Sequence, residues 1–344
     1  MRRDHGPGGL RPRLPRRGAR RCRGDLQRRA AAGGFAHPGP RLRRADDLGR
    51  TPRFVTGGIV NGFAVVGCGP AGIAAAVQLG REGRRPLVFE GRHPGGLLRN
   101  ANLVENYPGF PGGISGPELV ERMTAQLDGS GIELRREEIV ELRPRPGGFL
   151  LRGATAEYQA ARVVLAPGTR PRRLTLPAAC RSRVFSEIVE LTDRGPVEGR
   201  RIAIVGAGDA AFDYALNLAR ANEVVILNRA AATRCLPLLE RRAEEHPLIE
   251  QRRNVVLDAV EVSAAGLLLR CRSAAREYTL CVDYLLAAIG REPRLELLRD
   301  LTTPPPGLWL VGDAAHPRHR QTALAVGDGL RAALELTGDL EGAR

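Results

Sequence analysis

Residues 63–91 carry the pattern that most restricts how this chain can fold. The segment FAVVGCGPAGIAAAVQLGREGRRPLVFEG has the pattern of a short buried strand, a glycine turn, an amphipathic helix from about Ala71 and a second apolar strand ending at Glu90. Two strands joined by a helix of this length pair in parallel. The sequence therefore predicts an α/β fold built on a parallel sheet.

The glycine turn of this segment predicts a dinucleotide site. Gly67 permits a tight turn, Gly69 lets the backbone approach a pyrophosphate, and Gly72 lets helix and strand pack closely. The helix N-terminus directs its positive dipole end at the diphosphate. Glu90, 18 residues after Gly72, stands where a carboxylate accepts both hydroxyls of an adenosine ribose.

The same pattern returns at RRIAIVGAGDAAFDYALNLARANEVVILNRAAATR, with Gly206 and Gly208 in the turn. The strand after this helix ends in Asn228 and Arg229, followed by Arg234, and has no acid. Guanidinium groups suit a 2′-phosphate, although each arginine could also be an ordinary solvated charge. We therefore expect FAD at the first turn and NADPH, rather than NADH, at the second.

The remaining segments complete two such units. Residues 132–165 alternate apolar and polar residues in short runs, which predicts a small antiparallel meander ending in a buried strand. The C-terminal stretch predicts an apolar strand, the pair Gly312-Asp313, a loop and a helix from about Gln321. Asp313 at the end of a strand is either a ligand-binding group or a helix cap.

From Phe63 to about Leu336 the chain resembles the low-molecular-weight thioredoxin reductase family. The motifs that carry the resemblance stand in the family's order: GCGPAG, Glu90, PGGLL, VENYPGFPGGISGPEL, VVLAPGT, VGAGDAA, AIG, VGDA and RQTA. The resemblance implies two Rossmann-like domains. The FAD-binding domain spans 60–176 and 291–344, and an inserted NAD(P)H-binding domain spans 177–290.

The resemblance also assigns cofactor contacts residue by residue. His316 and His319 would lie near the flavin, where they could relay a proton or be plain loop residues. We name no catalytic side chain, because hydride transfer between the two cofactors is their own chemistry, and the scattered cysteines predict no metal site. The cofactor-binding positions that the resemblance implies are Gly67, Gly69, Pro70, Ala71, Gly72, Glu90, Gly95, Gly96, Leu97, Asn106, Gly168, Gly206, Gly208, Asp209, Ala210, Arg229, Arg234, Gly290, Gly312, Asp313, Arg320, Gln321 and Thr322.

The chain departs from the family pattern at several places. Ala230 replaces a middle arginine of the segment that binds the 2′-phosphate, Pro167 a threonine and Leu97 a polar residue, and the stretch between Gly290 and Trp309 is short. The largest departure lies between residues 173 and 201, where the family's disulfide reductases carry C-x-x-C just before the second glycine turn. In this chain the corresponding segment, VFSEIVELTDRGPVEG (184–199), contains no cysteine. Reduction of thioredoxin by the family's disulfide relay is therefore not expected.

What remains is hydride transfer from NADPH to FAD and onward to an acceptor that the sequence does not identify. The acceptor could be a small molecule or a small redox protein. Other interpretations stay open: a ferredoxin or flavodoxin reductase, although the aromatic C-terminal segment typical of that group is missing, or a non-catalytic FAD- and NADPH-binding regulatory protein. The resemblance further implies a homodimer.

Composition restricts the remaining possibilities. The 53 basic residues are all arginine, which excludes lysine Schiff-base chemistry and a P-loop. The six cysteines are scattered with no C-x-x-C pair, and no apolar stretch could span a membrane, so we expect a cytoplasmic protein.

Residues 1–59 hold 16 arginines against four acids among many glycines and prolines, and we expect them to be disordered. This tail could be a nucleic-acid or membrane arm, a targeting peptide, or translated sequence upstream of a start near Val60. We favour the last and expect no nucleic-acid or membrane partner.

Overall fold

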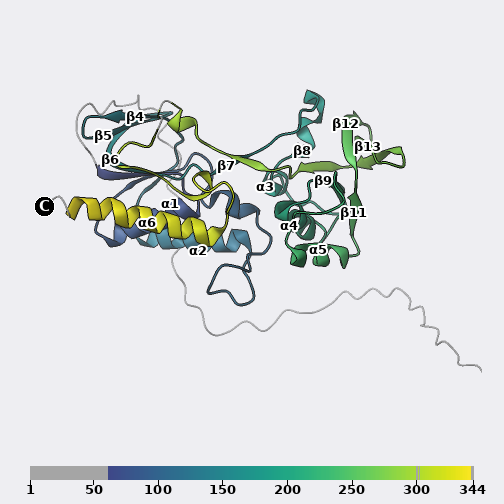
Figure 1. The fold of residues 1–344 in the computed structure, drawn as a ribbon, viewed down its shortest axis with the longest axis horizontal. Helices are drawn as coiled ribbons and strands as arrows, with labels where there is room; N and C mark the ends of the chain where they lie inside the picture. Colours follow the sequence, from purple (N-terminus) through teal and green to yellow (C-terminus); the bar gives the residue numbers. More distant parts are fainter. Residues whose placement is uncertain (1–60, 300, 302, 342–344) are drawn as a thin grey trace, which may run out of the picture. The chain divides into compact units, whose positions relative to one another are not determined.

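The computed structural model describes residues 61–299, 301 and 303–341. Within them the chain forms one mixed and one parallel β-sheet with helices packed against them, so the predicted α/β class is confirmed (Figure 1). The prediction of a disordered tail, with its possible upstream origin, lies outside the described residues.

The first sheet has the strand order β3-β2-β1-β6-β5-β4, and β17 also pairs with β6. The central strands β1, β2, β6 and β17 are parallel, whereas β4, β5 and β6 form the predicted antiparallel meander. The strands are β1 (Asn61–Val66), β2 (Leu87–Phe89), β3 (Leu134–Arg135), β4 (Ile139–Arg145), β5 (Gly148–Gly153), β6 (Glu157–Leu165) and β17 (Leu308–Leu310).

Three helices cover one face of this sheet: α1 (Pro70–Arg81), α2 (Gly116–Gly129) and α6 (Thr322–Glu341). α1 begins at Pro70, one residue before the expected start. Proline is favoured as the first residue of a helix, because an N–H at that position would have no partner within the helix and proline has none. Its apolar side bears Ile73 and Leu79, which are buried with Val65 and Val164 of the sheet. α6 lies along α1 and joins the same core (Figure 1).

The second sheet is parallel throughout, with the order β11-β10-β9-β15-β8. Its core gathers Ile202 and Ile204 of the sheet with Phe212 of α4. The strands are β8 (Val184–Phe185), β9 (Arg201–Val205), β10 (Glu223–Asn228), β11 (Ile249–Arg253) and β15 (Tyr284–Ala287), and the helices are α3 (Ile188–Thr192), α4 (Asp209–Leu218) and α5 (Pro237–Glu244).

A three-stranded antiparallel sheet follows β11, and the sequence interpretation did not anticipate it. It consists of β12 (Val256–Ser263), β13 (Gly266–Arg272) and β14 (Glu277–Val282). Leu269 and Leu280 on its inner side are buried with Leu227 of β10. The alternation in GLLLRCR and EYTLCV was the signal for these strands.

Two short strands pair where the chain passes between the first and second sheets. β7 (Thr169–Pro171) and β16 (Arg291–Pro293) form an antiparallel ribbon. Arg170 Nε of β7 donates to Glu292 Oε1 of β16 at 2.6 Å. The short 3₁₀ helices are η1 (Gly96–Asn100), η2 (Ala178–Ser182), η3 (Glu296–Leu298) and η4 (Gly312–Ala314).

Candidate functional site

The first glycine turn joins β1 to α1 with almost no room for side chains. Gly67 has φ +99°, and a Cβ there would meet the carbonyl oxygen of Ala166 well inside 3.0 Å. A Cβ on Gly72 would meet the Gly67 carbonyl oxygen equally closely. A Cβ on Gly69 would meet nothing within 4 Å. The turn therefore packs tightly on the sheet at two glycines and leaves open space at the third, which is where a diphosphate would approach the backbone.

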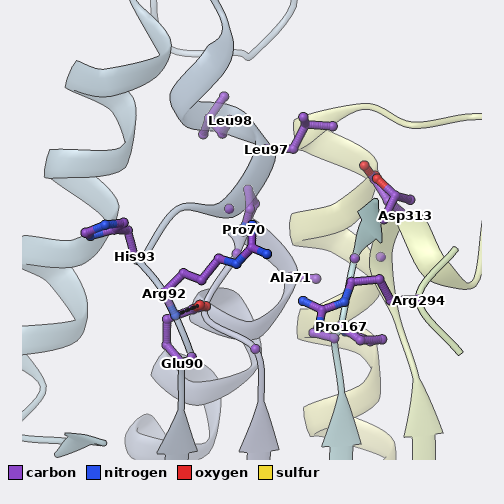
Figure 2. Close-up of a pocket in the computed structure, with 18 of the residues that line it drawn as sticks. Pro70, Ala71, Glu90, Arg92, His93, Leu97, Leu98, Pro167, Arg294 and Asp313 are labelled. Carbon is purple, nitrogen blue, oxygen red and sulfur yellow. Dashed lines mark hydrogen bonds between the residues drawn. The ribbon is translucent and has the colours of Figure 1, made fainter. Parts of the chain in front are cut away.

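A cavity of about 740 Å³ opens at the carboxyl ends of β1, β2, β6 and β17. Figure 2 shows Glu90 and Asp313 on either side of Pro70, the first residue of α1. This is where open α/β sheets bind ligands. Thirteen of the sequence-predicted residues line the cavity: Gly67, Gly69, Pro70, Ala71, Glu90, Gly96, Leu97, Gly168, Gly312, Asp313, Arg320, Gln321 and Thr322.

Glu90 follows β2 and is held by backbone groups. Its Oε2 accepts the N–H of Cys68 at 2.9 Å, and its Oε1 accepts the N–H of Arg92 at 2.8 Å (Figure 2). Each carboxylate oxygen keeps a second lone pair for a hydroxyl group. Glu90 thus both closes the glycine turn and points an oriented acid at the cavity.

Three further predicted residues lie beside the cavity without lining it. The Gly95 N–H donates to the carbonyl oxygen of Cys68 at 2.7 Å, which ties the PGGLL segment to the glycine turn. Asn106 Nδ2 donates to Gln321 Oε1 at 2.8 Å. Gly72 is buried under the turn. The structure thus brings together segments that are far apart in the sequence.

Asp313 lies in η4 and lines the cavity, and α6 begins only at Thr322, so Asp313 is not a cap of that helix. Burial raises the pKa of its carboxyl group, and Arg320 and Arg291 oppose the rise. Its side chain forms no hydrogen bond with the described residues. A partly buried carboxyl group without a hydrogen-bond partner, next to a cavity, is suited to bind a hydroxyl group of a ligand.

Sequence reasoning missed the residues that support this wall. Asp328, buried in α6, accepts the Gly312 N–H at 2.7 Å and pairs with Arg331 at 2.8 Å. His316 Nε2 lies 3.2 Å from the same carboxylate. Neither His316 nor His319 lines the cavity. Their geometry fits loop residues rather than a proton relay.

An ion pair inside the cavity was also missed. Arg291 Nη1 lies 2.6 Å from Glu187 Oε1, and the two side chains are only 14% and 16% exposed. Arg291 also donates to the side chain and the carbonyl oxygen of Thr169. Val189 and Glu190 of α3 also line the cavity. They belong to the sequence segment in which the family's disulfide reductases carry the cysteine pair that this chain lacks.

The second glycine turn repeats the construction of the first. Gly206 has φ +142°, and a Cβ there would meet the Ala288 carbonyl oxygen well inside 3.0 Å. A Cβ on Gly208 would meet nothing within 4 Å. Asp209 and Ala210 open α4 and are exposed. Ala211, in the place of a third glycine, is fully buried.

The cationic side chains expected at this turn are free. Arg229 and Arg234 are both exposed, and neither forms a hydrogen bond or ion pair with its side chain within the part of the chain that the structure describes. The backbone of Arg234 pairs with Gly208, and its N–H donates to Ala207 at 2.7 Å. Asn228 is buried, and its side-chain amide accepts the N–H of Ala230 and donates to the carbonyl oxygen of Ala232.

The cysteines show no pairing among the described residues. Cys68, Cys180, Cys235, Cys271 and Cys281 are free thiols. Burial, with a contribution from Glu90, raises the pKa of Cys68 to about 12, so its thiol is unreactive near neutral pH. The described residues also contain no cluster of side chains suited to a metal ion, and none of their helices is long and apolar enough to cross a membrane.

The chain matches the pyridine nucleotide-disulphide oxidoreductase family over residues 62–329. It belongs to this family, and the relatives that it matches are named as thioredoxin reductases.

Individual relatives narrow the comparison to thioredoxin reductases. A bifunctional thioredoxin reductase/thioredoxin of Mycobacterium leprae is 35% identical over 79% of this chain, which spans 64% of that protein's length. A thioredoxin reductase of Streptomyces coelicolor is 33% identical, with 80% of this chain and 92% of the relative covered. The crystal structure of Lactococcus lactis thioredoxin reductase superposes with a TM-score of 0.75 at 26% identity, covering 81% of this chain and 98% of that one.

Proposed function

We propose that this chain binds FAD at the first glycine turn and NADPH at the second, and passes reducing equivalents from NADPH through the flavin to an acceptor without a cysteine relay. One observation carries the proposal. The same glycine construction occurs twice, with an oriented acid, Glu90, beside the first turn and two free arginines, Arg229 and Arg234, beside the second.

The residues lining the first cavity fit FAD. The open space at Gly69 and the N-terminus of α1 suit its diphosphate, Glu90 suits its adenosine ribose, and the unsatisfied Asp313 suits a hydroxyl of its ribityl chain. When bound, FAD accepts a hydride from the nicotinamide, which is chemistry that the cofactors supply. The protein has to bind and orient the two cofactors and exclude water.

At the second turn, the chain's residues favour the phosphorylated coenzyme. Among the residues that the structure describes, the side chains of Arg229 and Arg234 have no partners that a 2′-phosphate would need to displace, and no acid directly follows β10 to bind a free ribose diol. Guanidinium groups form strong charge-assisted bonds with phosphate. We propose NADPH as the preferred coenzyme, NADH as the weaker one, and contacts from Gly206, Gly208, Asp209 and Ala210 to its diphosphate.

We also propose the domain limits. The FAD-binding domain would span 60–176 and 291–344 and the NAD(P)H-binding domain 177–290, with Gly168 and Gly290 near the crossings. The β7/β16 ribbon supports this division, because the chain leaves and re-enters the first sheet there. A cytoplasmic homodimer without nucleic-acid or membrane partners completes the proposal, and it rests on the free thiols and the family resemblance.

The acceptor is proposed to be reduced directly at the flavin. The support is the absence of cysteine from residues 181–234 and the wall of Glu187, Val189 and Glu190 beside the cavity. The relatives are named as reductases of thioredoxin, but thioredoxin would then be a poor acceptor for this chain. A ferredoxin, a quinone and oxygen are the acceptors to compare with it.

Anaerobic mixing of the FAD-loaded protein with NADPH tests the proposal. We expect the visible absorbance of the flavin to bleach rapidly, and we expect thioredoxin to reoxidise it no faster than buffer does. Bound FAD that NADPH fails to bleach would contradict the oxidoreductase function and favour a regulatory flavoprotein. Rapid reoxidation by thioredoxin would contradict the absence of a relay.

A further inference from the structure

Asp213 lies one turn into α4, the helix that begins at the second glycine turn, and holds a loop that leads to the first cavity. Its Oδ2 accepts the N–H of Asn102 at 2.8 Å. A backbone N–H that donates to a carboxylate fixes the loop more firmly than a side-chain contact does, because it has no rotamer freedom to lose.

Two arginines reinforce the same loop. Arg220, just after α4, donates to Asn102 Oδ1 at 2.6 Å. Arg242 of α5 binds both carboxylate oxygens of Glu105, at 2.6 and 2.9 Å. Residues 102–105 are therefore held by α4 and α5, although they belong to the segment between η1 and α2.

The loop continues directly into the flavin site. Asn106 follows Glu105 and donates to Gln321, which lines the cavity. Pairing between Val104 and Ile114, at 2.8 and 3.1 Å, closes the loop and limits its freedom. A shift of residues 102–105 would consequently move Asn106 relative to Gln321.

At its other end, α4 is tied to the second site. Asp209, its first residue, accepts the Leu236 N–H at 2.8 Å, and Gly208 pairs with Arg234. A ligand on this turn contacts the helix that carries Asp213. A contiguous set of hydrogen bonds thus links the second glycine turn, through α4 and the 102–106 segment, to the edge of the first cavity.

We propose that Asp213 is a positioning residue that couples the two nucleotide sites, by holding the 102–105 loop so that Asn106 and Gln321 close the edge of the flavin cavity. The inference rests on the proposed function, because it requires FAD at one site and a phosphorylated adenine nucleotide at the other. Ligand at the second turn stabilises α4 and its hold on the loop, so it slows the release of FAD. Coupling of this kind is reciprocal.

The test measures FAD release from the loaded protein, with and without saturating 2′-phospho-ADP-ribose. This probe has the diphosphate and the 2′-phosphate but no nicotinamide, so it cannot slow release by stacking on the flavin. We expect it to slow release about fivefold in the wild type and less than twofold in Asp213→Asn. Asp258→Asn is the matched control, since Asp258 pairs with Arg272 on the separate three-stranded sheet, and it should keep the wild-type ratio.

Arg220→Gln is the second variant if Asp213→Asn fails to fold. It removes one exposed contact to the loop, and we expect the ratio to fall to about twofold to threefold. An unchanged ratio in either folded variant, or a wild-type ratio of one with the probe shown to bind, would overturn the coupling. A protein that retains no FAD, or does not bind the probe, would instead contradict the proposed function.

Discussion

Alanine at Gly69 and alanine at Gly72 should differ in their effect on the stability of the FAD-free protein, although the two glycines are only three residues apart. Gly69 has φ −79° and ψ −175°, which alanine adopts without strain, and its added Cβ would meet no protein atom within 4 Å. We therefore expect Gly69→Ala to leave the FAD-free protein's free energy of unfolding unchanged or raised by about 0.5 kcal/mol. Its methyl group would occupy the space that the diphosphate needs, so FAD affinity should fall about tenfold to hundredfold.

In Gly72→Ala the added Cβ would collide with the Gly67 carbonyl oxygen inside the protein. Because that oxygen is backbone, α1 must retreat from the turn by roughly 1 Å, and overpacking of this kind costs about 2 kcal/mol. That cost lowers the Tm by roughly 3 °C in a protein of this size. FAD affinity should fall as well, since α1 carries the diphosphate site.

Thermal unfolding of FAD-free protein and fluorescence titration with FAD separate the two effects. We expect Gly69→Ala to keep the wild-type Tm and to bind FAD weakly, and we expect Gly72→Ala to unfold at a lower temperature. If Gly69→Ala binds FAD as tightly as the wild type, the open space at Gly69 is not the approach of the diphosphate. If instead it unfolds at a lower temperature, the geometry of the turn is wrong.

Three other expectations follow from the site. Glu90→Ala should weaken FAD about tenfold to hundredfold by titration, because charged hydrogen bonds are worth roughly 1.5–3 kcal/mol each, and an unchanged Kd would contradict its ribose role. Arg229→Ala with Arg234→Ala should abolish a preference for NADPH over NADH of about a hundredfold in flavin reduction rates, and a wild-type ratio near one would refute the assignment. Burial raises the pKa of Asp213 from 3.8 to about 6, although the N–H of Asn102 and the Arg220 guanidinium oppose this, so its ionisation disfavours the folded state. Between pH 5 and 7.5 the wild type should therefore lose about 1.4 kcal/mol of unfolding free energy relative to Asp213→Asn, and equal pH dependence in urea titrations would contradict this.

The parts of the site that the sequence predicted depend on local backbone chemistry. The turn at Gly67, the entry to α1 and the acid after β2 lie within one strand–helix–strand unit, where residue type and spacing determine the conformation. The resemblance assigned Asn106 and Gln321 to the same cofactor, and in the structure their side chains are hydrogen-bonded at 2.8 Å although they are 215 residues apart.

The residues that the sequence did not predict have partners chosen by tertiary packing. Nothing near Glu187 indicates that Arg291 lies 2.6 Å away, because their contact depends on how α3 sits against the β7/β16 ribbon. Asp213 resembled any polar residue on an amphipathic helix, and only the structure shows that it accepts the N–H of Asn102 in the loop. The strands β12 to β14 had a detectable alternation of apolar and polar residues, but they contain none of the motifs that carry the family resemblance.

The pairing of α1 with α6 has a consequence for the order of events during synthesis. α1 begins at Pro70, but the helix that covers it begins only at Thr322. At about 5–20 residues per second, a ribosome takes on the order of 10–50 s to synthesise the chain between them. Throughout that interval the apolar side of α1 lacks its partner and the cavity lacks the wall that Asp313 provides. The second sheet is complete by Ala287, so it can fold on the ribosome while the nascent first sheet waits, exposed to chaperones, for its last strand and helix.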